Sequence, residues 1–143
     1  MTILILGAGQ LARMMCLAGA PLTLNVVASD VGSKQIVHPL TGQIYTTTLE
    51  QAIVDAHAIT AEFEHSPDDV LTLCCASKKF YPGKAAIKTG GDRALEKALL
   101  SKTAVKCAPY QLITETAHLE HTVARYVTTL LNKTCQAVYD GQR

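Results

Sequence analysis

The chain has 143 residues, a formal net charge of +1, 48% hydrophobic residues and 17% charged residues. This length suits one domain, or one small domain with part of another, and the near-neutral charge excludes a broad electrostatic field for nucleic acid or an anionic membrane. The charged fraction lies below the ~25% of an ordinary soluble domain, which suggests additional buried or interfacial surface.

Strand and helix patterns alternate through the first part of the chain. Apolar strand patterns cover residues 2–6, 24–29, 43–46, 58–64 and 79–82. Helical patterns cover residues 10–20, 49–56 and 66–77. Such alternation predicts βαβ units and an α/β fold with a Rossmann-like, doubly wound parallel sheet.

Local signals refine three of the expected helices. The first carries an apolar stripe at helical spacing, formed by Leu11, Met14, Met15 and Ala18. Thr48 and Gln51 form a possible capping box at the start of the second helix. Ser66 is the expected N-cap of the third, with Pro67 at its first helical position.

The pattern changes near Gly90 and Gly91, which mark a candidate boundary between domains at 1–90 and 91–143. Beyond it we expect helices at 92–102 and 119–130 and strands at 108–113 and 130–134.

Neither targeting signals nor a disulfide framework can be recognised. The first strand pattern has no basic segment before it, and no apolar run reaches the ~18 residues of a membrane span. The cysteines are odd in number and include no C-x-x-C pair. We expect reduced, mostly buried thiols in a cytoplasmic protein, at Cys16, Cys74, Cys75, Cys107 and Cys135.

The stretch "GAGQLA" (7–12) fits the pattern G-x-G-x-x-G/A between a strand and a helix. Gly7 permits a tight turn, and Gly9 allows a ligand to approach backbone amides at a helix start that attracts anions. Asp30 ends the second strand, where dinucleotide folds place an acid that binds the ribose. A small dinucleotide-binding module that uses Gly7, Gly9 and Asp30 is therefore one possible function.

Five stretches together resemble the 5-(carboxyamino)imidazole ribonucleotide synthases, an ATP-grasp family of purine biosynthesis. The family motifs are G-x-G-Q-L-G-R-M, ITxEFENVP, QDRxxEKxFL, APF and VLKTRxGGYDGKGQ. The matching stretches are "GAGQLARM" (7–14), "ITAEFEHSP" (59–67), "GGDRALEKALL" (90–100), "CAPYQLI" (107–113) and "LNKTCQAVYDG" (131–141).

The resemblance implies a pre-ATP-grasp domain followed by the first elements of an ATP-grasp domain. In the family, ATP phosphorylates bicarbonate, and the carboxyl group then passes to aminoimidazole ribonucleotide. The implied cofactors are ATP and Mg²⁺, with the magnesium ligands outside this chain, and the implied assembly is a homodimer. On this interpretation the chain is the N-terminal portion of an ATP-dependent ligase and is inactive alone.

The resemblance also implies roles for individual residues. Arg93 and Lys133 match ATP-binding positions. Tyr139, Asp140 and Gly141 match the family's ATP-binding phosphate loop, and Tyr139 and Asp140 are the implied catalytic residues. The positions expected to hold the ribonucleotide are Gly7, Gly9, Gln10, Leu11 and Glu62.

Each charged candidate also has a purely structural explanation. Arg93 could pair with Glu96 on a helix surface, Lys133 could protect a strand edge, and Glu62 could cap a strand end. The loop departs from the family, because Ala137 and Val138 replace two glycines that allow backbone to approach phosphate. A non-catalytic remnant or fragment kept for its fold is thus a further alternative.

Overall fold

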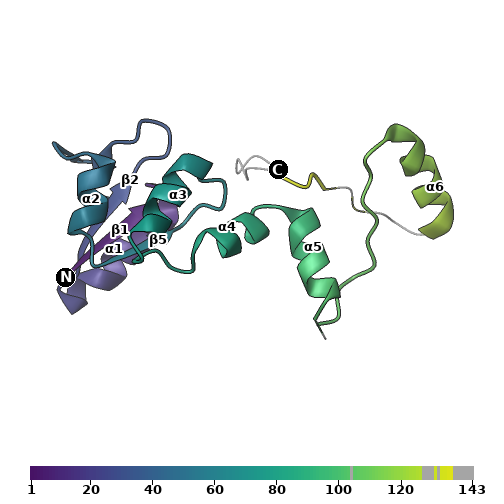
Figure 1. Cartoon of the computed structure of the whole chain (residues 1–143), viewed down its shortest axis with the longest axis horizontal. Helices are drawn as coiled ribbons and strands as arrows, with labels where there is room; N and C mark the ends of the chain where they lie inside the picture. The colour runs from purple at the N-terminus through teal and green to yellow at the C-terminus, as the bar shows by residue number, and fades with distance from the viewer. Residues whose placement is uncertain (104, 127–130, 132, 137–143) are drawn as a thin grey trace. The chain divides into compact units, whose positions relative to one another are not determined.

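The structure, a computed structural model, describes residues 1–103, 105–126, 131 and 133–136 (Figure 1). The chain divides into two compact units, Met1–Lys88 and Thr89–Arg143. The boundary between the units lies close to the domain boundary expected at residue 90. The assignment of 1–90 and 91–143 as domains stays a prediction.

The first unit is built on a five-stranded sheet (Figure 1). Its strands lie in the order β4-β3-β2-β1-β5. They are β1 (Thr2–Leu6), β2 (Asn25–Ser29), β3 (Ile36–Val37), β4 (Ile44–Tyr45) and β5 (Ala58–Ala61). β1 is parallel to both β2 and β5, whereas β3 and β4 add an antiparallel hairpin. The predicted α/β fold is confirmed, with a sheet that is mixed rather than wholly parallel.

Helices cover both faces of this sheet. The alternation of side chains along β1 directs Ile5 toward one face, where it packs with residues of α1 (Gln10–Gly19). Leu4 and Leu6 point to the other face and pack with α2 (Leu49–Asp55) and α3 (Asp68–Ala76). Because β2 and β5 are both parallel to β1, the carboxyl ends of these three strands lie at one edge of the sheet, between the two helical layers.

Helix α1 does not pack on the sheet through its apolar stripe. Leu11, Met14, Met15 and Ala18 are exposed, and the buried residues of the helix are Ala12, Cys16 and Gly19. A Cβ at Gly19 would lie 3.2 Å from Cγ2 of Val26. Small residues let the helix approach β2 closely, so the larger apolar side chains are left on its outer face.

The start of α2 follows its predicted capping signal, whereas the start of α3 does not. Thr48 caps α2, because its hydroxyl oxygen accepts from the backbone amide of Gln51 at 3.2 Å. Ser66 does not cap α3; its hydroxyl donates to the carbonyl of Phe63, and Pro67 with extended backbone occupies the N-cap position.

Two short strand features differ from expectation. The pattern at 43–46 becomes β4, whereas the sequence analysis does not predict β3. The expected strand at 79–82 is reduced to a single parallel bridge between Ile59 and Phe80. It nevertheless covers part of the outer edge of β5.

The chain continues through helices α4 (Lys84–Gly90), α5 (Arg93–Ser101) and α6 (Thr116–Tyr126). The strand expected at 108–113 is absent. Of the strand expected at 130–134, the described residues 131, 133 and 134 do not belong to a sheet. A strand needs a partner strand for its backbone groups. The described residues of the second unit contain no strand that could pair with either segment. In the part of the chain that the structure describes, no helix is long and apolar enough to span a membrane.

Candidate functional site

The turn after β1 has the backbone geometry that its glycines predict. Gly7 has φ of +110°, a conformation that residues with a side chain rarely adopt. Its backbone amide donates to the carbonyl of Ser29 at 2.9 Å. Gly9 is the N-cap of α1 and contributes no side-chain cap of its own. The start of α1 therefore depends on another residue for a hydrogen-bond acceptor.

Glu62 supplies that acceptor from the neighbouring strand. Leu6 of β1 lies opposite Ala61 of β5, and the backbone amide of Glu62 donates to the carbonyl of Leu6 at 3.0 Å. The carboxylate turns over the glycine turn: Oε1 accepts from the amide of Gly9 at 2.5 Å, and Oε2 accepts from the amide of Ala12. One carboxylate thus satisfies two backbone donors in the first turn of α1.

The glycines are required by this contact as well as by the turn. A Cβ at Gly9 would lie 2.8 Å from Oε1 of Glu62, and a Cβ at Gly7 would collide with Cγ of the same side chain. Sequence reasoning assigned this closeness to an external ligand. In the structure, the group that approaches the turn is the protein's own carboxylate.

The five residues expected to hold a ribonucleotide gather at this edge of the sheet. Gly7 is buried, Glu62 is half-buried, and Gly9, Gln10 and Leu11 are exposed on the first turn of α1. Their roles in binding stay predictions.

Asp30 is already engaged within its own loop. Its Oδ1 accepts from both the backbone amide and the hydroxyl of Ser33, each at 2.7 Å. These hydrogen bonds, the backbone one foremost, lower the pKa of Asp30. The acid that the dinucleotide alternative assigns to a ribose instead shapes the turn between β2 and β3.

The two expected ATP-binding cations belong to the second unit. Arg93 is the first residue of α5, with Nη1 at 3.9 Å from Oε2 of Glu96, as its structural explanation anticipated. Its backbone amide donates to the carbonyl of Cys135 at 2.9 Å. Lys133 is exposed and lies two residues before Cys135, a span of at most about 7 Å. The segment that carries Lys133 is therefore held at the start of α5.

Asp92 joins the same two segments, and the sequence analysis did not single it out. Its Oδ1 accepts from the amides of Ala94 and Leu95 at 2.8 and 3.2 Å, which caps α5. Its Oδ2 accepts from Nε2 of Gln136 at 2.8 Å. These bonds, led by the one from Gln136, lower the pKa of Asp92. An Asp directly before a helical pattern is a recognisable cap signal, whereas the contact with Gln136 has no sequence signature.

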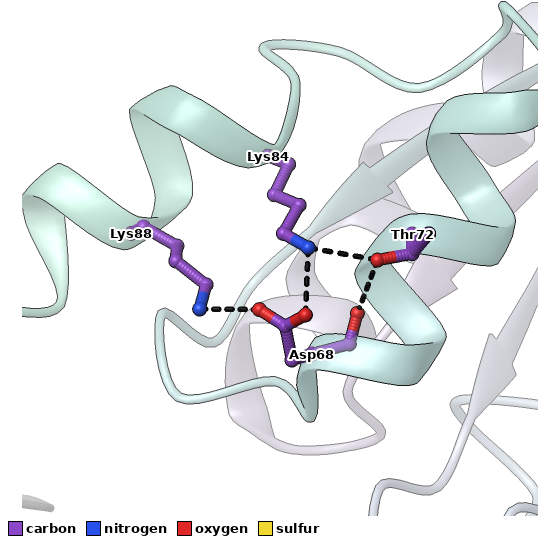
Figure 2. Close-up of polar contacts among 4 residues, drawn as sticks. All are labelled: Asp68, Thr72, Lys84 and Lys88. Atoms are coloured by element: carbon purple, nitrogen blue, oxygen red, sulfur yellow. Dashed lines mark hydrogen bonds and ion pairs between the residues drawn. The ribbon is translucent and has the colours of Figure 1, made fainter.

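A third polar cluster lies in the first unit, where the first turn of α3 meets α4 (Figure 2). Asp68 accepts from Nζ of Lys84 at 2.7 Å and forms an ion pair with Lys88. Nζ of Lys84 also donates to the hydroxyl of Thr72 at 2.7 Å. The hydrogen bond from Lys84, followed by that from Lys88, lowers the pKa of Asp68 to about 2. The cluster fixes α4 against α3 but brings together no catalytic set.

Tyr139, Asp140 and Gly141 lie outside the described residues. No group of three or more His, Cys, Asp or Glu side chains suited to a metal ion occurs among the described residues. All five cysteines are free, but the expectation that most are buried is wrong. Only Cys16 and Cys74 are buried, because they pack against the sheet, whereas Cys75, Cys107 and Cys135 are exposed.

The sequence of the first unit matches the model of a known family. The chain belongs to the family of ribonucleotide synthetase preATP-grasp domains, whose model matches residues 1–90. It is 51% identical over 142 residues to N5-carboxyaminoimidazole ribonucleotide synthase of Vibrio cholerae, a match that covers 99% of this chain. The resemblance found in the sequence is thereby confirmed over nearly the whole chain.

Two solved structures show the same fold. N5-carboxyaminoimidazole synthetase of Staphylococcus aureus, complexed with ADP, aligns with a TM-score of 0.72 and 24% identity over 96% of this chain and 39% of its own. The Aspergillus clavatus synthase, in complex with ADP and 5-aminoimidazole ribonucleotide, aligns with a TM-score of 0.67 and 24% identity over 87% of this chain and 35% of its own. The chain spans 38% of the length of its Vibrio cholerae relative.

Proposed function

We propose that this chain is the N-terminal portion of an ATP-dependent ligase that carboxylates aminoimidazole ribonucleotide with bicarbonate in purine biosynthesis. The observation that carries the proposal is the 51% identity to the Vibrio cholerae synthase across 99% of the chain. The fold supports it, since the first unit places a glycine turn and an acid at the carboxyl edge of a parallel pair of strands.

In this proposal each unit contributes its own ligand-binding residues. Gly7, Gly9, Gln10, Leu11 and Glu62 face the ribonucleotide, and Arg93 with Lys133 binds ATP. Arg suits phosphate oxygens as a planar fork and Lys as a point charge. Tyr139, Asp140 and Gly141 complete the phosphate loop, with Tyr139 and Asp140 near the reacting groups. Mg²⁺ accompanies ATP and takes its ligands from residues beyond this chain.

We further infer a cytoplasmic homodimer. The outer face of α1 offers an apolar surface for a second copy, since Met14 and Leu17 are 55% and 59% exposed. Sedimentation velocity over a range of concentrations measures association directly. We expect a dimer that dissociates in Met14→Glu, and a monomer at all concentrations would contradict this assignment.

The isolated chain should not catalyse the reaction. Phosphoryl transfer depends on cations and donors aligned around the nucleotide, and this chain supplies only part of them. We expect ATP binding no tighter than about millimolar, roughly −4 kcal/mol, and no release of phosphate from ATP with magnesium, bicarbonate and aminoimidazole ribonucleotide.

The decisive experiment restores the missing portion. The chain is fused to the part of the Vibrio cholerae synthase that follows the matched region, and phosphate release is measured. We expect turnover that needs both bicarbonate and aminoimidazole ribonucleotide and that is lost in Lys133→Ala. The double change Ala137→Gly and Val138→Gly should raise the rate, because glycine lets backbone approach phosphate. A folded fusion that is inactive even with both glycines would refute the proposal, as would turnover by the isolated chain that Lys133→Ala abolishes.

A further inference from the structure

We propose that Glu62 is a resident anion at the start of α1, and that it excludes phosphate and other oxyanions from the Gly7–Gly9 turn. This inference goes beyond the proposed function, and it rests only on contacts within the first unit. It makes Glu62 a residue that determines which ligand groups can reach the turn.

The first turn of a helix is an attractive site for an anion. Its backbone amides have no partner within the helix, and the helix dipole places partial positive charge there. In α1 this charge is not offset locally, because the first turn carries no acidic residue and Gly9 has no side chain to act as a cap. Left uncovered, the Gly9 and Ala12 amides would therefore be available to a phosphate or sulfate.

Glu62 occupies those donors as an oxyanion would. Two oxygens of one charged group accept from the amides of Gly9 and Ala12, which is the bidentate arrangement that a bound phosphate would make. The acid comes from the end of β5, 53 positions from Gly9 in sequence, and not from the helix itself. Its charge offsets the dipole that would otherwise draw a ligand's phosphate.

The position of Glu62 is fixed by the fold. Its backbone amide is bonded to the carbonyl of Leu6, so the residue continues the register of β5 beside β1. The space for its side chain exists only because positions 7 and 9 lack a Cβ. The two glycines thus admit the carboxylate, and a second anion would meet both an occupied donor pair and a like charge.

The test compares sulfate binding by the full 143-residue chain and three variants. Backbone amide chemical shifts of Gly9 and Ala12 are followed by NMR during titration with sodium sulfate, against sodium chloride at matched ionic strength. Glu62→Ala removes the carboxylate, and Glu62→Gln keeps the shape of the side chain without its charge. Glu64→Ala is the matched control, because it removes an equal charge from an exposed residue two positions away.

We expect Glu62→Ala to show saturable sulfate shifts at Gly9 and Ala12, with affinity at least tenfold above the wild type. Glu62→Gln should fall between the two, because its single carbonyl oxygen can hold only one of the amides. Glu64→Ala should behave as the wild type. The proposal is overturned by a wild type that binds sulfate at these amides as tightly as Glu62→Ala, or by a folded Glu62→Ala that gives no sulfate response there.

Should Glu62→Ala fail to fold, Glu62→Gln decides the question alone, and an affinity equal to that of the wild type refutes the proposal. Turnover by the fusion with the Vibrio cholerae portion is a separate measurement, so failure here and failure of the proposed function are distinguishable.

Discussion

Asp92 and Gln136, far apart in sequence, share a hydrogen bond of 2.8 Å between Oδ2 of the carboxylate and Nε2 of the amide. The other oxygen of Asp92 caps α5 through Ala94 and Leu95. The backbone bond from Arg93 to Cys135 runs beside this contact. A single side chain therefore both starts the helix and holds the segment that carries Lys133.

We expect Gln136→Leu to loosen that segment without unfolding α5. Hydrogen exchange at the Arg93 amide should become faster, because its acceptor at Cys135 loses the adjacent side-chain contact. Exchange at Ala94 and Leu95 should stay unchanged, since Asp92 still caps them. Asp92→Ala is the comparison variant and should speed exchange at all three amides. Unaltered protection of Arg93 in Gln136→Leu would show that the backbone bond alone holds the segment.

Asp68 should make the first unit sensitive to acid. Its pKa is lowered from 3.8 to about 2 in the folded protein by the hydrogen bonds from Lys84 and Lys88. A carboxyl group with a depressed pKa stabilises the fold above its unfolded pKa and loses that contribution as pH falls through the folded value. We expect the difference in melting temperature between the wild type and Asp68→Asn to be constant above about pH 5 and to shrink between about pH 4 and 2.

Calorimetric or circular-dichroism melting at several pH values measures this difference. Other carboxylates affect both proteins alike, so subtraction of the two curves isolates Asp68. A difference independent of pH down to 2 would mean that the two lysines do not engage the carboxylate in solution.

Two leucines of α3 provide a matched pair for the packing of the core. Leu71 is 1% exposed and packs in the core between α3 and the sheet, whereas Leu73 on the same helix is 37% exposed. Leu71→Ala should lower the free energy of unfolding by about 2–5 kcal/mol, because it deletes buried methyl groups and leaves a cavity. Leu73→Ala should change it by only about 0.5 kcal/mol. Urea denaturation of both variants measures the contrast, and equal effects would place α3 in a different orientation.

The cysteines should separate into two classes of reactivity. Burial, as the main cause, raises the pKa of the Cys74 thiol to about 11, which suppresses the reactive thiolate. Cys16 is buried as well, at 7% exposure. We expect a disulfide reagent to modify Cys75, Cys107 and Cys135 in the native chain and all five cysteines in denaturant. Mass spectrometry of digests identifies the sites, and rapid native modification of Cys74 would contradict its burial.

The parts of the fold that the sequence predicts are those with a repeating local pattern. The strand at 2–6 and the glycine turn after it are recovered because apolar residues and Gly7 lie next to each other in the chain. The helix cap at Thr48 is recovered for the same reason. The strand at Ile36–Val37 is not, because it is defined by pairing with two other strands and not by a local pattern.

The site shows the same division between local and distant information. Gly7, Gly9 and Glu62 could be selected from motifs, but the bond between the carboxylate and the amide of Gly9 depends on the register of β5 beside β1. The face on which α1 packs is, for a related reason, not the one that bears its apolar stripe. Hydrophobicity alone favours Leu11 and Met14, whereas the close approach of the helix to β2 selects small residues.

The short strands at the two margins of the sheet also limit how the folded unit can aggregate. β4 contains only Ile44 and Tyr45, and at the opposite margin Phe80 already bridges to Ile59 of β5. A foreign strand can extend a sheet only where it finds a long row of unsatisfied backbone groups. Such a strand would gain few hydrogen bonds at either margin, so fibril growth by strand addition requires prior unfolding of the first unit.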